Sequence, residues 1–123
     1  MSNERRSFPR VELAGEANIL LAGVVRNGTL TNLSPSGIQI ECRHQLIEQL
    51  NKVKSSSGLY PDFELEFTLP AAPQDKAVVK STCTVSYCRR LKQDCYHLGL
   101  NFVELSATAE QQVSEYIHHS AAA

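Results

Sequence analysis

The stretch FELEFTL, residues 63–69, alternates strictly between apolar and polar side chains. A period of two residues indicates a β-strand with one buried and one solvated face, because successive side chains on a strand point to opposite faces. The same period recurs along most of the chain, so the sequence predicts a mainly β protein. The other predicted strands are marked by Val11, Leu13, Ala17, Ile19 and Leu21; by residues 25–31; by Ile38, Ile40 and Cys42; by Val79, Cys83, Val85 and Tyr87; and by Leu98, Leu100 and Phe102.

The connections between these segments favour antiparallel pairing. Ala-Gly at residues 22–23 and Arg-Asn-Gly at residues 26–28 have the chemistry of tight turns. Few gaps are long enough for the crossover helix that parallel neighbours need. About six antiparallel strands result, and a closed or nearly closed barrel is the arrangement that hides both edges of such a sheet.

Two segments break the strand period and predict helices. Between Arg43 and Ser57, apolar side chains recur at helical spacing before a serine-rich stretch, which predicts a short internal helix and then a mobile loop up to residues 60–61. Near the C-terminus, Thr108 and Gln111 have the spacing of a capping box. We therefore expect a second helix to start there and to plug one end of the barrel.

Charge and apolar runs limit the classes of function. The 123 residues are enough for one domain, and 12 Lys+Arg against 13 Asp+Glu give no overall field that attracts nucleic acid or an anionic membrane. The longest apolar run, residues 19–22, is too short to cross a bilayer, and the first residues lack the apolar stretch of a signal peptide. We expect a cytoplasmic protein that does not contact membranes and in which any anion binding is local.

The cysteine spacing gives no sign of a metal site. No CxxC pair is present, and Cys83 and Cys88 are five residues apart, an odd spacing that points them to opposite faces of one regular strand. In a reducing compartment Cys42, Cys83, Cys88 and Cys95 are expected to be small, buried or half-buried apolar side chains. No GxSxG, HExxH or GxxxxGK motif occurs, so we predict no metal, no cofactor and no enzyme activity.

Two short segments carry the chemistry of anion binding. RRSFPR, residues 5–10, supplies three guanidinium groups, each a planar fork of donors that engages phosphate oxygens, or guanine O6 and N7, two at a time. In NLSPSG, residues 32–37, Asn32 and Ser34 project to one side of a strand end, and Gly37 leaves room for a ring near the backbone. Separately, the first segment fits a solubilising basic tail and the second an ordinary turn.

Together, the two segments resemble the paired motifs of PilZ domains. Residues 6–10 match the RxxxR motif and residues 32–37 match the (D/N)xSxxG motif, both completely. The resemblance covers most of the chain, because LGLNF at residues 98–102 falls on the last main strand and a helix follows. It implies a six-stranded antiparallel β-barrel with a C-terminal helix that binds the bacterial second messenger cyclic di-GMP.

The resemblance also assigns roles to individual residues. The implied ligand-binding set is Arg5, Arg6, Arg10, Asn32, Ser34, Gly37 and Tyr87. The RxxxR arginines would contact phosphates and guanines, Asn32 and Ser34 would contact guanine and phosphate, and Gly37 would admit the base. Arg5, just before RxxxR, would favour an intercalated cyclic di-GMP dimer. Tyr87 resembles an aromatic or basic position that packs on the ligand in some members, and it fits a core tyrosine equally well.

The predicted function is that of a receptor and adaptor. We expect ligand binding to change the conformation of the arm and thereby to regulate an unidentified partner protein. The predicted organisation is a flexible arginine-rich arm at residues 1–10, a PilZ barrel with its C-terminal helix at residues 11–119, and a frayed tail at residues 120–123. Two other classes stay open: a ligand-independent protein-interaction domain, and a small RNA-binding β-barrel, which the few aromatics and the net charge of -1 disfavour.

Overall fold

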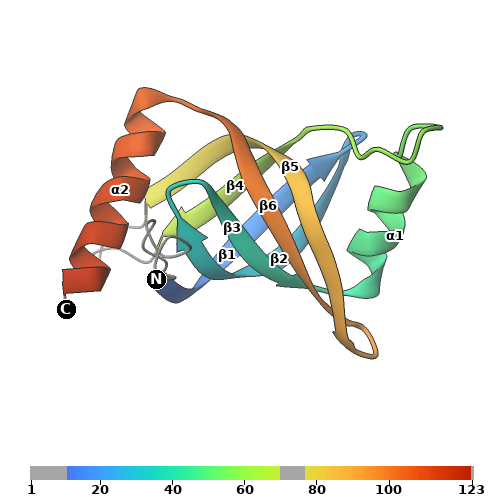
Figure 1. Ribbon diagram of the computed structural model, residues 1–123, viewed down its shortest axis with the longest axis horizontal. Coiled ribbons are helices and arrows are strands. Elements are labelled where there is room, and N and C mark those ends of the chain that lie inside the picture. Colours follow the sequence, from blue (N-terminus) through green and yellow to red (C-terminus); the bar gives the residue numbers. More distant parts are fainter. Residues whose placement is uncertain (1–10, 70–76, 123) are drawn as a thin grey trace, which may run out of the picture.

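The computed structural model describes residues 11–69 and 77–122 (Figure 1). Its elements are β1 (Val11–Leu21), β2 (Val24–Ser34), β3 (Gly37–Cys42), α1 (His44–Lys52), β4 (Phe63–Leu69), β5 (Ala77–Lys92), β6 (Cys95–Leu105) and α2 (Ala107–Ala122). The strands form a closed barrel in the order β1-β2-β3-β6-β5-β4, and each neighbouring pair is antiparallel. The predicted six-stranded antiparallel barrel with an internal and a C-terminal helix is therefore confirmed.

The barrel closes through the first strand. Ala17 of β1 lies opposite Gly28 of β2 on one side and opposite Phe67 of β4 on the other. Pairing on both sides gives the backbone donors and acceptors of residues 17–20 their partners. Among the described residues, the part of β1 that continues from the N-terminal arm pairs with β2 alone.

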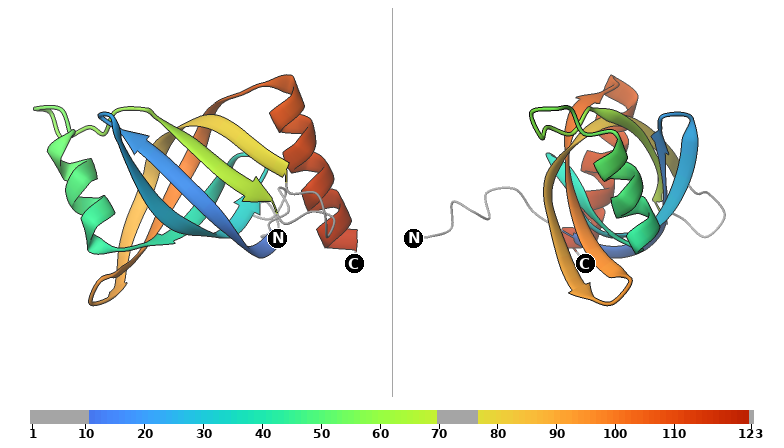
Figure 2. Two further views of the ribbon diagram at one scale, coloured as in Figure 1. Left: turned by 180° about the vertical axis from the view of Figure 1, so that it is seen from behind. Right: turned by 90° about the vertical axis from the view of Figure 1, so that its right-hand side faces the viewer.

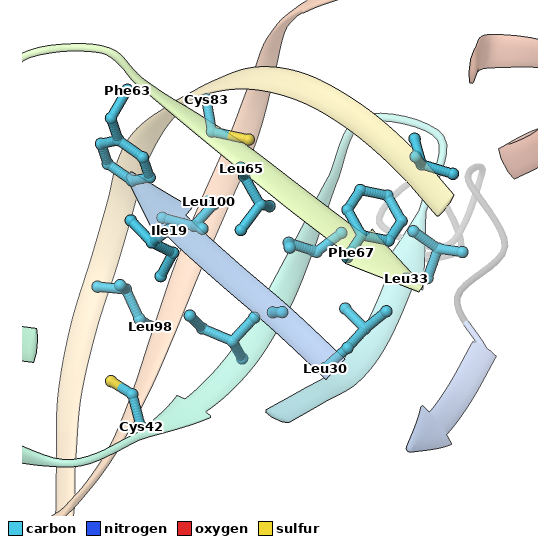
Figure 3. Close-up of a cluster of buried hydrophobic side chains, with 14 of the residues drawn as sticks. Ile19, Leu30, Leu33, Cys42, Phe63, Leu65, Phe67, Cys83, Leu98 and Leu100 are labelled. Atoms are coloured by element: carbon cyan, nitrogen blue, oxygen red, sulfur yellow. The ribbon is translucent and has the colours of Figure 1, made fainter. Parts of the chain in front are cut away.

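The interior follows the alternation of the strands (Figure 3). The four apolar residues of FELEFTL are buried, whereas its two glutamates are exposed. Phe67 is completely buried and stacks on Phe102 of β6, with ring centroids 6.0 Å apart and an angle of 16° between the ring planes. Cys42 and Cys83 lie in the same core. Side chains from all six strands therefore form one hydrophobic core inside the barrel.

The two helices cover opposite ends of the barrel, as the views along and across it show (Figures 1 and 2). The side chains of α1 that join the core are Leu46, Ile47 and Leu50. Those of α2 are Ala109, Val113 and Ile117. The prediction that the second helix plugs one end is confirmed. Within the described residues, neither helix combines the length and the apolar character needed to cross a membrane.

The start of α2 differs from the predicted one. Ser106 is its N-cap, because the Ser106 Oγ accepts a hydrogen bond from Ala109 N at 3.1 Å. The predicted capping box of Thr108 and Gln111 is wrong, since both residues lie inside the helix. Serine and threonine are both good caps, and spacing alone favoured the wrong one. The helix continues to Ala122.

The N-terminus of α1 is capped by a residue from a distant hairpin. Arg43, the residue before the helix, makes no side-chain capping bond. Instead Asp94, in the turn between β5 and β6, accepts hydrogen bonds from His44 N at 2.9 Å and from Arg43 Nε at 3.0 Å. The bond from His44 N, with the Arg43 charge as a further cause, lowers the pKa of the Asp94 carboxyl. The carboxylate therefore helps to join the hairpin to α1.

Changing Asp94 to asparagine keeps a capping oxygen but removes the charge. The pKa of Asp94 is lower in the folded protein than in the unfolded chain, where it is about 3.9, so the charge stabilises the fold above that value. This stabilisation is lost as the pH falls through the lower, folded pKa. We expect wild type to resist urea better than Asp94→Asn at neutral pH, with the difference shrinking as the pH falls below about 4. A difference that is constant with pH would contradict the pairing.

Candidate functional site

A hollow with a volume of about 150 Å³ lies on the outer face of the barrel beside the turn between β2 and β3. Its lining residues are Asn32, Leu33, Ser34, Ser36, Gly37, Ile38, Gln39, Ser86, Tyr87, Gly99, Leu100 and Asn101. Four residues of the predicted ligand-binding set are among them, namely Asn32, Ser34, Gly37 and Tyr87. They come from three different strands, so the fold brings them together although the sequence separates them.

Ser34 organises the turn that forms one side of the hollow. Its Oγ accepts hydrogen bonds from the backbone N–H groups of Ser36 and Gly37, at 3.3 and 3.2 Å. The carbonyl oxygen of Ser36 in turn accepts a hydrogen bond from Phe102 N at 2.9 Å, which joins the turn to β6. The serine that the motif assigns to a ligand therefore also fixes the local backbone, as serine side chains often do in turns.

Gly37 is explained by the close approach of two strands. It lies opposite Asn101 of β6, and a Cβ at this position would overlap the carbonyl oxygen of Leu100. The Asn101 Cα would be a further 3.2 Å neighbour. Backbone atoms cannot move aside as the end of a side chain can. The absence of a side chain at Gly37 is thus required by the pairing of β3 with β6.

Changing Gly37 to alanine should therefore destabilise the barrel. Extra atoms in a filled space typically cost about 1–3 kcal/mol, and we expect the free energy of unfolding to fall by that amount. Urea unfolding followed by far-UV circular dichroism measures it. Ser36→Ala in the same turn is the matched control, with an expected change within about 0.5 kcal/mol. Equal stability of Gly37→Ala and wild type would contradict the close approach.

Asn32 and Ser34 face the same side, as the strand period predicts. Leu33 between them is fully buried, whereas both polar residues are partly exposed and line the hollow. Asn32 lies opposite Gln39 of β3 and opposite Glu12 of β1. An amide and a hydroxyl are therefore presented together at the end of β2.

Tyr87 points out of the barrel, and its interpretation as a core residue is wrong. In β5, Val85 lies opposite Leu100 and Tyr87 lies opposite Gly99, so Ser86 is the extra residue of a β-bulge. A bulge reverses the alternation of faces beyond it. Tyr87 consequently shares the outer face with Gly99, and it is 41% exposed.

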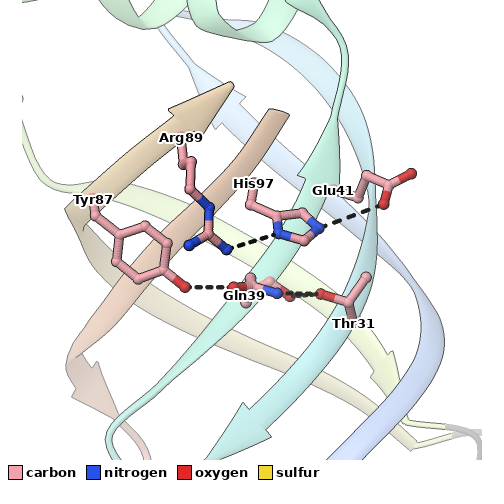
Figure 4. Close-up of polar contacts among 6 residues, drawn as sticks. All are labelled: Thr31, Gln39, Glu41, Tyr87, Arg89 and His97. Carbon is pink, nitrogen blue, oxygen red and sulfur yellow. Dashed lines mark hydrogen bonds and ion pairs between the residues drawn. The ribbon is translucent and has the colours of Figure 1, made fainter. Parts of the chain in front are cut away.

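Two rows of polar side chains cross the outer face next to the hollow (Figure 4). In the first row, the Tyr87 hydroxyl donates a hydrogen bond to Gln39 Oε1 at 2.6 Å. In the second row, Arg89 Nη2 lies 3.4 Å from His97 Nδ1, and His97 Nε2 lies 3.6 Å from Glu41 Oε1. The first row belongs to the hollow, and the second places a guanidinium group beside it.

The arm with Arg5, Arg6 and Arg10 lies outside the described residues, but its point of attachment is described. β1 begins at Val11, which lies opposite Leu33, between the two polar residues at the end of β2. A chain spans at most about 3.6 Å per residue, so the five steps along the chain from Arg6 to Val11 cover no more than roughly 18 Å. The chain therefore enters the barrel beside the hollow.

A family model described as the PilZ domain matches residues 4–119. The chain belongs to the PilZ domain family. PilZ domains are ligand-binding and adaptor domains, so the family agrees with the prediction that the chain is not an enzyme. A search of curated proteins gives no significant match.

Solved structures share the fold of this PilZ domain. The inhibitor of motility MotI/DgrA from Bacillus subtilis has a TM-score of 0.72 and 17% identity over 94% of this chain and 51% of that chain. The PilZ domain of YcgR from Escherichia coli, with c-di-GMP, has a TM-score of 0.58 and 14% identity over 97% and 93%. PlzA from Borreliella burgdorferi, in complex with c-di-GMP, has a TM-score of 0.60 and 8% identity over 92% and 51%. This chain thus spans about half the length of MotI/DgrA and of PlzA.

The cysteines of this PilZ domain lie away from the hollow. Burial raises the pKa of Cys42 to about 12 and that of Cys83 to about 11, so both are neutral thiols at neutral pH. The bulge in β5 places Cys83 and Cys88 on the same face, where a regular strand would have placed them on opposite faces. Cys88 is exposed, so the expectation that it is buried or half-buried is wrong. Within residues 11–69 and 77–122, no group of three or more His, Cys, Asp or Glu side chains is placed to hold a metal ion.

Sequence reasoning missed Gln39, Gly99 and Asn101 as lining residues of the hollow. Gly99 did have a signal, because it stands between two inward-facing leucines and so had to lie on the outer face of its strand. Gln39 had none, since it alternates with isoleucines as an exposed glutamine would. In the structure it is only 9% exposed, and its amide bonds to the side chains of Thr31 in β2 and Tyr87 in β5.

Proposed function

We propose that this PilZ domain is a receptor for cyclic di-GMP and binds it in the hollow beside the β2–β3 turn. The observation that carries the proposal is that the chain following the RxxxR motif and the NxSxxG turn meet at this hollow, since Val11 lies opposite Leu33. Guanidinium groups, an amide and a hydroxyl are the donors and acceptors that phosphates and guanine edges need.

The hollow is too small to hold the whole ligand, so the arm must supply part of the binding site. Sites for drug-sized ligands are typically about 300–1,000 Å³, whereas the hollow has about 150 Å³. We propose that Asn32, Ser34 and Tyr87 contact one part of the ligand on the barrel, beside the backbone of Gly37. Arg6 and Arg10 would contact the phosphates and the guanine edges outside the hollow, and Arg5 would stabilise a second, intercalated nucleotide.

The relatives support this proposal by what their structures contain. The YcgR PilZ domain and PlzA were solved with c-di-GMP, and MotI/DgrA is an inhibitor of motility. We propose that the chain acts in the cytoplasm as an adaptor. Its arm, residues 1–10, would change conformation on the barrel domain, residues 11–119, and so alter the affinity for a partner protein. The partner must then change the affinity for the nucleotide by the same factor.

Isothermal titration of the purified protein with cyclic di-GMP tests the receptor function. We expect dissociation constants at or below the micromolar range, which correspond to about 8 kcal/mol or more, and no comparable binding of GTP or cyclic di-AMP. A ratio near two nucleotides per chain would support the role of Arg5. Absence of heat at several temperatures, with no displacement of a labelled nucleotide, would overturn the proposal and favour a ligand-independent interaction domain.

A further inference from the structure

The ring of Tyr87 lies flat on the backbone of β6 at Gly99. A Cβ built on Gly99 would overlap three ring atoms of Tyr87, Cδ2, Cε2 and Cζ, to nearly the same extent. Such even overlap occurs only when the face of the ring, and not its edge, covers the glycine. One face of the ring is therefore against the barrel, and the 41% exposure of the residue belongs largely to the other side.

The hydroxyl of Tyr87 is fixed by a directional chain of hydrogen bonds (Figure 4). Thr31 Oγ1 donates a hydrogen bond to the carbonyl oxygen of Gln39 at 3.0 Å. Because its proton is used in this bond, Thr31 Oγ1 accepts the hydrogen bond from Gln39 Nε2 at 3.1 Å. With the amide nitrogen directed at Thr31, Gln39 Oε1 is left to accept from the Tyr87 hydroxyl at 2.6 Å. Each donor in the chain has one acceptor, which sets the orientation of the Gln39 amide and with it the position of the ring.

We propose that Gln39 is a positioning residue that, with Thr31, holds the Tyr87 ring on Gly99 as a stacking platform for a base of the ligand. The proposal rests on the proposed cyclic di-GMP site. The phenol hydroxyl is already bonded to Gln39, so Tyr87 recognises the ligand through its free ring face. Aromatic platforms of this kind bind bases with little dependence on base-edge hydrogen bonds.

The affinity for cyclic di-GMP provides the first test. Tyr87→Ala should weaken binding by roughly 5–150-fold, the range found when a base loses a stacking partner. Gln39→Met, which keeps the side-chain length but removes both hydrogen bonds, should weaken it by roughly 2–12-fold. In the Tyr87→Ala background, Gln39→Met should have no further effect, because Gln39 acts through the ring. Ser81→Ala is the matched control: it removes a buried serine that donates to the carbonyl oxygen of Leu65, outside the hollow, and should leave affinity unchanged.

The second test needs no ligand. A ring face over Gly99 shifts the Gly99 Hα resonances upfield in the NMR spectrum, and Tyr87→Ala should remove that shift. Gln39→Met should reduce it. In the titrations of the first test, Gly99→Ala should lower affinity as much as Tyr87→Ala does. If wild type binds cyclic di-GMP and Gln39→Met changes neither the shift nor the affinity, the positioning role is overturned while the receptor function stands. If wild type binds no cyclic di-GMP, both are overturned.

Discussion

Changing Phe67 to alanine is expected to lower the free energy of unfolding by about 3–5 kcal/mol. Phe67 is completely buried and stacks on Phe102 across the interior of the barrel. The variant loses the free energy gained by removing the ring from water. It also loses the contacts of the atoms that line the new cavity. Since domains have about 5–15 kcal/mol in total, the loss should move the urea unfolding midpoint strongly, as measured by far-UV circular dichroism.

A control variant at the surface shows how much stability is lost when an exposed, and not a buried, apolar side chain is truncated. Leu59 is 68% exposed, and Leu59→Ala should change stability by no more than about 0.5 kcal/mol. A loss below about 1 kcal/mol for Phe67→Ala would show that the barrel interior collapses around the vacated space or is loosely packed.

The double change Arg6→Ala and Arg10→Ala should reduce affinity for cyclic di-GMP by roughly 10²–10⁴-fold. Hydrogen bonds to charged groups contribute about 1.5–3 kcal/mol each, and each guanidinium group is proposed to make at least one such bond with a phosphate or guanine. Isothermal titration measures the loss. The stability of the barrel should stay within about 0.5 kcal/mol, because both changes precede the first strand.

A second double change controls for net charge. Arg90→Ala with Lys92→Ala removes two positive charges from the hairpin of β5 and β6, which lies at the α1 end of the barrel. Its affinity for cyclic di-GMP should remain within about threefold of wild type, since neither side chain lines the hollow and both are exposed to screening by salt. Equal losses in the two double variants would mean that overall charge, and not the RxxxR motif, attracts the nucleotide.

The barrel was predictable because one local rule governs nearly all of it. Where strands are regular, as at FELEFTL, the period of two residues identifies the buried side chains without error. At the bulge at Ser86, one of several irregularities in register, this rule did not give the orientation of Tyr87, since the sequence around the bulge has no glycine or proline to mark it. The orientation of Tyr87 is decided by the pairing of β5 with β6, which is a tertiary property.

The candidate site could be predicted in its motifs but not in its supporting contacts. Asn32 and Ser34 were found because their chemistry and spacing are local. Gln39 and Thr31 act through hydrogen bonds between strands, and no local pattern specifies such partners. Asp94 is a similar case, because a helix cap supplied from another hairpin cannot be read from the residues next to the helix.

The capping of α1 by Asp94 has a consequence for the order of folding. A helix as short as His44–Lys52 is marginal in isolation, and here its first backbone N–H is satisfied by a residue that follows it in the chain by 50 positions. During synthesis, α1 leaves the ribosome well before the hairpin that caps it. Stable helix formation is therefore coupled to the closing of β5 on β6, which makes α1 a late and non-local element of folding although its residues are adjacent in sequence.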